Sequence, residues 1–221
     1  VVLLLLMVLV GCVAVPPVDV VQEKQHKLKI RGEVSDEKRT CIFDALSFLP
    51  EKVRQSVEEI HLRKDIEHFT YLYLDKGWRI ARGHNCTYGG RKVCLRSEEL
   101  DYKLVWHEVT HVYNLTLKDR DKFLEEWAKI AGDVYVPNYE NWYWIDASDG
   151  LFTWYSRKNV IEDVAEWVEE CLDYLHLNPK TTVFTNKHLK TDNRYRQKLA
   201  CLHKYGFIDE SDYKKLKPLF E

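Results

Sequence analysis

Residues 104–113, Leu-Val-Trp-His-Glu-Val-Thr-His-Val-Tyr, are the stretch from which the fold and the site can be predicted. His107 and His111 are four residues apart, about one helical turn, so on a helix their imidazoles share one face and can reach the same ion. Glu108 lies beside them, where its carboxylate can meet a water molecule on that ion. The apolar flanks contain no Pro or Gly and predict a buried helix.

The pattern His-Glu-x-x-His on a helix is typical of zinc peptidases, but it has only three fixed positions and also occurs by chance. A histidine on an apolar helix face is often a core residue without a metal. The variable positions in and just around this motif are uncharged, as a helix under a cleft requires. A hydrolytic zinc needs three protein ligands and one open position, so a third ligand must come from another segment.

Residues 155–166 offer this third ligand. Glu162 and Glu166 are four residues apart on one face of a predicted helix, and the small Ala165 allows another helix to approach closely. We expect Glu162 to bind zinc and Glu166 to accept the N–H of a zinc-binding histidine. A solvated acidic face is the alternative, since most Glu pairs at this spacing are used in that way. Asn159 and Glu162 also match a capping box, which would direct Glu162 to the backbone instead.

Glu-x-x-Ala-Glu after a His-Glu-x-x-His helix resembles the glutamate zincins, and is most similar to the anthrax lethal factor-like metallopeptidases. In that family a tyrosine lies seven residues before the ligand Glu, and Tyr155 has this place here. The resemblance covers about residues 97–175. It implies one Zn²⁺ ion held by His107, His111 and Glu162, with Tyr155 lining the cleft opposite the zinc. It does not imply that host proteins are the substrates.

The composition is that of an ordinary globular protein. The chain has 221 residues, of which 45% are hydrophobic and 31% charged, enough for one domain with a full core. The net charge of −2 gives no general attraction to nucleic acid. We expect no nucleic-acid partner and a monomer, and the peptide or protein substrate follows from the zinc-peptidase motif above.

The first residues predict export. Residues 1–10 are an unbroken apolar run, too short to span a bilayer but suited to the core of a signal peptide. The run ends in Leu-Val-Gly-Cys, which resembles a bacterial lipobox, so we expect Cys12 to be lipidated. An ordinary cleaved signal with a coincidental Cys is the alternative, and the protein would then be secreted. Residues 13–36 mix Pro with charge and predict a tether between the membrane and a metallopeptidase domain at 37–221.

The remaining five cysteines are an odd number. Cys86 and Cys94 bracket a turn with two glycines, so a disulfide between them is expected in an oxidising compartment. Of Cys41, Cys171 and Cys201 at most two can pair, and the sequence does not say which.

The fold class that these patterns predict is α+β. We expect a zincin-like metallopeptidase domain with a small mixed sheet, an edge strand beside the His-Glu-x-x-His helix and a mostly helical C-terminal half. Helices are predicted at about 50–59, 123–131 and 160–175, with a final helix pair after Tyr195. Strands are predicted at 60–63, 78–84 and 91–96. In zincins a strand at the last place edges the cleft, so Val93, Cys94 and Leu95 would bind an extended substrate by strand addition, although an ordinary sheet strand fits equally well.

Together these residues predict a zinc-dependent peptidase, of the endopeptidase type. Zinc would acidify a water molecule and polarise the scissile carbonyl, Glu108 would act as general base, and Tyr155 would donate to the developing oxyanion or to the leaving group. The alternative is a catalytically inactive, zinc-containing lipoprotein that binds peptides. Glu108 argues against it, because a structural metal site needs no base. A purely structural helical lipoprotein, without metal, is a third interpretation.

Overall fold

A computed structural model gives the fold of the chain. The residues that it describes are 28–32, 34–64, 70–74, 77–81, 86–88, 91–135, 149–180, 184 and 188–221, with the backbone alone for 70–88. The predicted signal segment with Cys12, most of the predicted tether and residues 136–148 lie outside the described residues. No helix in the described part of the chain is long and apolar enough to cross a membrane.

The N-terminal half contains a four-stranded mixed sheet. Its order is β1 (Lys29–Gly32), β2 (Glu59–Arg63), β6 (Lys92–Arg96) and β5 (Cys86–Tyr88). The first three strands are parallel, and β5 pairs antiparallel with β6. A separate antiparallel hairpin is formed by β3 (Thr70–Leu74) and β4 (Gly77–Ala81). Because parallel neighbours need a crossover connection, the chain from β1 to β2 passes through helices.

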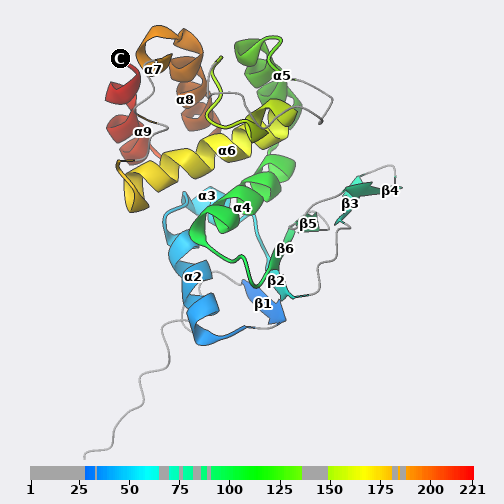
Figure 1. The fold of residues 1–221 in the computed structure, drawn as a ribbon. Helices are drawn as coiled ribbons and strands as arrows, with labels where there is room; N and C mark the ends of the chain where they lie inside the picture. The colour runs from blue at the N-terminus through cyan, green and yellow to red at the C-terminus, as the bar shows by residue number, and fades with distance from the viewer. Residues whose placement is uncertain are drawn as a thin grey trace, which may run out of the picture.

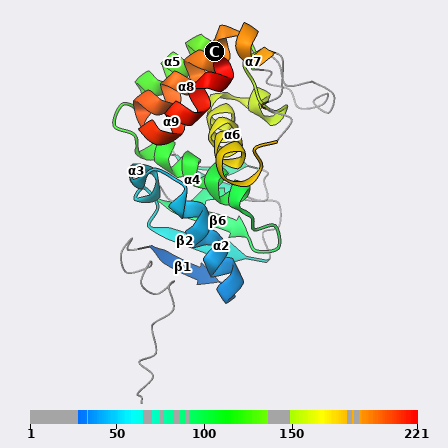
Figure 2. The ribbon, with the colours of Figure 1, turned by 90° about the vertical axis from the view of Figure 1, so that its left-hand side faces the viewer.

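The crossover from β1 to β2 contains α2 (Asp36–Ser47) and the short α3 (Glu51–Arg54). Helix α4 (Tyr102–Thr116) follows β6, and α2 and α4 cover the same face of the sheet (Figures 1 and 2). The C-terminal half is helical in its described residues, with α5 (Arg120–Ala131), η2 (Tyr155–Lys158), α6 (Val160–Leu172), η3 (Asp173–Leu177), α7 (His188–Thr191), α8 (Asn193–Tyr205), α9 (Glu210–Leu216) and η5 (Lys217–Phe220). Helix α6 lies between α4 and the C-terminal helices α7–α9 (Figure 1).

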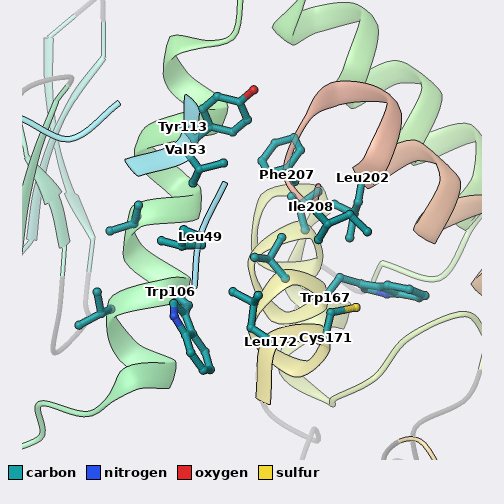
Figure 3. Packing of buried hydrophobic residues seen from close by; sticks show 14 of the residues in the cluster. Leu49, Val53, Trp106, Tyr113, Trp167, Cys171, Leu172, Leu202, Phe207 and Ile208 are labelled. Atoms are coloured by element: carbon teal, nitrogen blue, oxygen red, sulfur yellow. The ribbon is translucent and has the colours of Figure 1, made fainter. Parts of the chain in front are cut away.

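One hydrophobic cluster joins the two halves. Trp106 of α4 and Trp167 of α6 are fully buried in it, together with Phe207 and Ile208 from the turn after α8 (Figure 3). The indole N–H of Trp106 donates to the carbonyl of Ala45 at 2.7 Å, which fixes α4 on α2. Burial of an apolar side chain of this size contributes about 1.5–3 kcal/mol, so α4 and α6 are held together by packing as well as by their polar groups.

The α+β class with a small mixed sheet and a mostly helical C-terminal half is confirmed. The predicted helix at 104–113 extends to α4 at both ends, with Asp101 capping it through a 2.7 Å bond from the backbone N–H of Leu104. The helix predicted at 50–59 is shorter, because the chain enters β2 at Glu59. The helix predicted at 160–175 is α6, followed by the wider turn η3.

The end of the tether and the position of the substrate-binding strand differ from the sequence-based expectations. The predicted tether 13–36 is too long, because β1 pairs with β2 and Leu28 is buried in the core, so the domain begins by residue 28. The prediction that residues 91–96 form the edge strand that binds substrate is also wrong. Strand β6 lies between β2 and β5 instead of at the edge, and Val93 and Leu95 point into the core with 1% and 0% exposure. The edge strand beside α4 is β5.

The predicted strand pair around the Cys-bracketed turn is replaced by a different pairing. The strand expected at 78–84 is β4 and pairs with β3, whereas β5 pairs with β6 and starts at Cys86. Cys86 and Cys94 are directly opposite each other in this register. Cross-strand neighbours have Cβ atoms about 4.5–5.5 Å apart, near the separation that a disulfide requires. The side chain of Cys86 is outside the described residues, and the disulfide stays a prediction.

Candidate metal centre

Helix α4 turns the His-Glu-x-x-His motif toward α6. His107 and His111 have ring centroids 4.7 Å apart and ring planes almost perpendicular, at 88°. Both side chains are nearly buried, with 11% and 14% exposure. On the opposite side, Val105, Val109 and Val112 are fully buried in the core. These apolar residues thus hold α4 against the core, and the two histidines face α6.

Helix α6 brings Glu162 to the two histidines. The Glu162 Oε2 atom lies 3.2 Å from Nε2 of His107 and 3.2 Å from Nε2 of His111. Asn159 caps α6 by accepting from the backbone N–H groups of Ile161 at 2.9 Å and Glu162 at 3.0 Å. The capping-box alternative is therefore only half realised, because the carboxylate of Glu162 contacts side chains across the site.

The three donor groups fit a zinc ion in type and spacing. All their donor atoms lie within 4.8 Å of one another. Zinc–nitrogen and zinc–oxygen bonds of about 2.0–2.2 Å in a tetrahedral site place neighbouring donors about 3.3–3.6 Å apart. The 3.2 Å separations around Glu162 Oε2 are close to this value. Two imidazoles and one carboxylate are also the ligand set of many catalytic zinc sites.

The charges around His107 favour a cation. Burial opposes protonation of His107, but hydrogen bonds to Glu162, Glu166 and Glu169 raise its pKa well above its usual value. Burial alone would raise the pKa of Glu162, but its contacts with His107, His111 and Lys158 hold it well below its usual range. Positive charge between these carboxylates is thus strongly stabilised, whether a proton or a metal ion supplies it.

The other ring nitrogen of His107 faces two carboxylates. Its Nδ1 lies 3.2 Å from Glu166 Oε1 and 3.2 Å from Glu169 Oε2. Glu166 also accepts a 2.5 Å hydrogen bond from the hydroxyl of Thr153, and Lys103 lies 3.3 Å from Glu169. Burial and the neighbouring Glu166 carboxylate raise the pKa of Glu169. Although His107, Glu166 and Glu169 could also surround an ion, an imidazole that binds metal through Nε2 keeps its proton on Nδ1, so these carboxylates serve as acceptors.

Tyr155 and Lys158 form the wall next to Glu162. The ring of Tyr155 is 6.0 Å from that of His107. Lys158 Nζ donates to Tyr155 Oη at 3.0 Å and to Glu162 Oε1 at 2.9 Å. Burial and the Glu162 charge raise the pKa of Tyr155, so the phenol keeps its proton at neutral pH and can donate it.

Glu108 is buried at 7% exposure on α4. It is adjacent to His107 and one helical turn before His111, so its side chain emerges beside the histidine face. The Nδ1 atom of His111 is buried and has no hydrogen-bond partner among the described residues. The two histidines therefore differ, since His107 is held on both nitrogens and His111 through Nε2.

The structure brings together all of the residues predicted as ligands and supports. His107, His111, Glu162, Glu166 and Tyr155 meet between α4, α6 and η2, whereas the predicted substrate residues Val93, Cys94 and Leu95 belong to β6. Sequence reasoning missed three residues that contact this group, namely Thr153, Lys158 and Glu169, and Lys103, which pairs with Glu169. Two of them carried a signal in their spacing, because Lys158 is four residues before Glu162, and Glu169 is three residues after Glu166 on the same face of α6.

Comparison with known proteins gives a match in fold only. No protein-family model and no curated protein matches the sequence. The fold is similar to a crystal structure of a proposed zinc-binding metallo-peptidase from Bacteroides caccae, with a TM-score of 0.52 and 19% sequence identity. The similarity covers 89% of this chain and 86% of the other. It shows that the two proteins share a fold over nearly the whole length of both chains.

Proposed function

We propose that this protein is a zinc-dependent peptidase that uses His107, His111 and Glu162 to hold the ion. One observation supports this most directly: Glu162 Oε2 lies 3.2 Å from Nε2 of both histidines, although it comes from a helix more than fifty residues later in the chain. A structural ion pair would need only one of these histidines. The fold similarity to a proposed zinc-binding metallo-peptidase is consistent with this function.

The residues of the site divide the work of hydrolysis among them. A bound zinc ion would lower the pKa of a water molecule to about 7 and would polarise the scissile carbonyl. Glu108 takes a proton from the attacking water and returns it to the nitrogen of the leaving amine. Tyr155 donates its O–H to the charge that develops on the carbonyl oxygen or on the leaving group. Glu166 and Glu169 hold the N–H of His107.

We further propose the glutamate-zincin subtype with an endopeptidase action, in the arrangement of the lethal factor-like metallopeptidases. The spacing from Tyr155 to Glu162 and the meeting of these residues with the two histidines support this subtype. We also propose that the protein is an exported lipoprotein anchored at Cys12. It would act as a monomer on peptide or protein substrates.

Replacement of the general base tests the proposed function. Glu108→Gln keeps the size of the side chain and should retain one zinc per chain, but peptide cleavage should fall by about 10²–10⁴-fold. Zinc content is measured by elemental analysis and cleavage on a denatured protein, with and without chelator. Glu125→Gln, an exposed change on α5, is the matched control. Parental cleavage by Glu108→Gln would remove Glu108 from the mechanism, and a parent that holds zinc without cleaving would indicate a peptide-binding protein instead.

A further inference from the structure

Lys158 connects two groups of the proposed active site. It is the last residue of η2, one residue before the Asn159 cap of α6. Its Nζ donates to Tyr155 Oη at 3.0 Å and to Glu162 Oε1 at 2.9 Å, and it lies 4.8 Å from the centre of the Tyr155 ring. The side chain is 19% exposed, so water competes little with these contacts. Hydrogen bonds from an ammonium group are stronger than neutral ones, especially where water is scarce.

The contact with Lys158 assigns different tasks to the two oxygens of Glu162. Oε1 accepts from Lys158, whereas Oε2 faces the Nε2 atoms of His107 and His111. A carboxylate without such a partner can rotate and present either oxygen, or both, to one cation. The Lys158 contact restricts this rotation and leaves a single oxygen on the histidine side.

The contact with Tyr155 directs the phenol. A phenol oxygen can accept one hydrogen bond and donate another. Since Tyr155 Oη accepts from Lys158, an ammonium that has no acceptor capacity, the O–H of Tyr155 must be donated to another group. Tyr155 has its ring 6.0 Å from that of His107, so this donor belongs to the same site.

We propose that Lys158 is a positioning residue that holds Glu162 Oε1 away from the metal ligands and leaves the O–H of Tyr155 for the substrate. The part that concerns Tyr155 rests on the proposed peptidase function, whereas the part that concerns Glu162 requires only metal binding. Loss of Lys158 should therefore change the metal site itself as well as turnover.

Three variants test this role. Lys158→Met removes the charge at similar length, Lys158→Arg keeps a cation, and Lys204→Met removes a lysine that pairs with Glu126 between α8 and α5. Zinc affinity is measured by competition with a chromophoric chelator, and the coordination of Glu162 by the visible spectrum of the cobalt(II)-substituted protein. Lys158→Met should bind zinc 10–100-fold more weakly, the range found when a group that orients a ligand is lost, and its cobalt spectrum should change. Its kcat should fall with little change in KM.

The other two variants and the parent protein separate the possible outcomes. Lys158→Arg should restore most of the affinity and the parental cobalt spectrum, and Lys204→Met should match the parent in both. Parental zinc affinity and an unchanged cobalt spectrum in Lys158→Met would overturn the proposal. A parent that binds zinc but cleaves no peptide contradicts the peptidase function alone, because affinity and spectrum still report on Lys158. If circular dichroism shows Lys158→Met to be unfolded, Lys158→Gln takes its place in the same measurements.

Discussion

Two neighbouring acidic residues at the start of α6 have opposite surroundings. Glu162 faces α4, is 15% exposed and places one oxygen 3.2 Å from both histidines. Asp163 faces the C-terminal helices and is fully buried, with Lys198 Nζ 2.6 Å from Oδ2. The same oxygen accepts from the indole N–H of Trp127 at 2.7 Å and from the hydroxyl of Tyr135 at 2.8 Å. One helical turn thus carries both a candidate ligand and a structural ion pair.

The two sites differ in their balance of charge. On the Asp163 side, one carboxylate meets one ammonium among the described residues, and Lys198 also donates to the carbonyl of Gly150 at 2.8 Å. Burial raises the pKa of Asp163 and lowers that of Lys198, so each charge depends on the other. On the Glu162 side, carboxylates cluster around nearly buried imidazoles, which can bind a metal through a lone pair. In a balanced pair each charge is compensated by its partner, whereas an excess of metal-binding acceptors indicates a place for a cation.

The largest expected effect on stability comes from breaking the balanced pair. Lys198→Met leaves Asp163 as a buried charge without its cation, and removal of one partner from such a pair costs about 3–5 kcal/mol. The free energy of unfolding, measured by urea denaturation of the metal-free protein, should fall by this amount. Zinc stoichiometry of the folded fraction should stay at the parental value, because Lys198 contacts none of the proposed ligands in the described residues.

Two further variants serve as controls for this comparison. Lys198→Met combined with Asp163→Asn removes both charges and keeps an acceptor for Trp127, so it should be more stable than the sum of the single changes predicts. Glu162→Gln should lose zinc binding, which Lys198→Met keeps. Its free energy of unfolding in the metal-free protein should fall by less than that of Lys198→Met. If Glu162→Gln retained zinc while Lys198→Met lost it, the assignment of the two sites would be wrong.

An intermediate effect on zinc affinity is expected from the two carboxylates that face Nδ1 of His107. Glu166→Gln combined with Glu169→Gln should weaken zinc binding by about 10–100-fold, since groups that orient a ligating histidine contribute in this range. Each single change should have a smaller effect, because the other carboxylate still lies 3.2 Å from Nδ1. Glu170→Gln is the matched control, since Glu170 pairs with Lys103 at 2.7 Å. Equal affinities for the parent and the double variant would show that neither carboxylate supports the histidine.

The candidate site could be predicted from the sequence largely because its spacing is local. His107 and His111 share a face by helical periodicity, and so do Glu162 and Glu166, so only the meeting of the two helices had to be inferred. Glu169 follows the same periodicity and could have been added. The ion pair could not be predicted, because lysine is rarely buried and the partners, Asp163 and Lys198, are thirty-five residues apart, with no pattern that links them.

The fold was predictable where apolar patterns are long and was not where strands are short. Strand β1 has four residues with mostly exposed side chains, so it shows no alternation that a sequence pattern could reveal. Strand β6 does alternate, with Val93 and Leu95 buried, but alternation does not distinguish an edge strand from an inner one. The position of β6 depends on pairing with β2 and β5, which are distant from one another in the chain.

The smallest expected effect comes from the Asn159 cap at the start of α6, just before both acidic residues. Asn159→Ala removes the acceptor of two backbone N–H groups at the start of α6, which should lower the free energy of unfolding by about 1 kcal/mol. Zinc affinity should fall less than in the variant that lacks both Glu166 and Glu169, because the Asp163–Lys198 pair still anchors the first turn from the opposite side. Urea denaturation and chelator competition give the two values. If the free energy of zinc binding fell by more than the free energy of unfolding, the cap, and not the buried pair, would fix the position of Glu162.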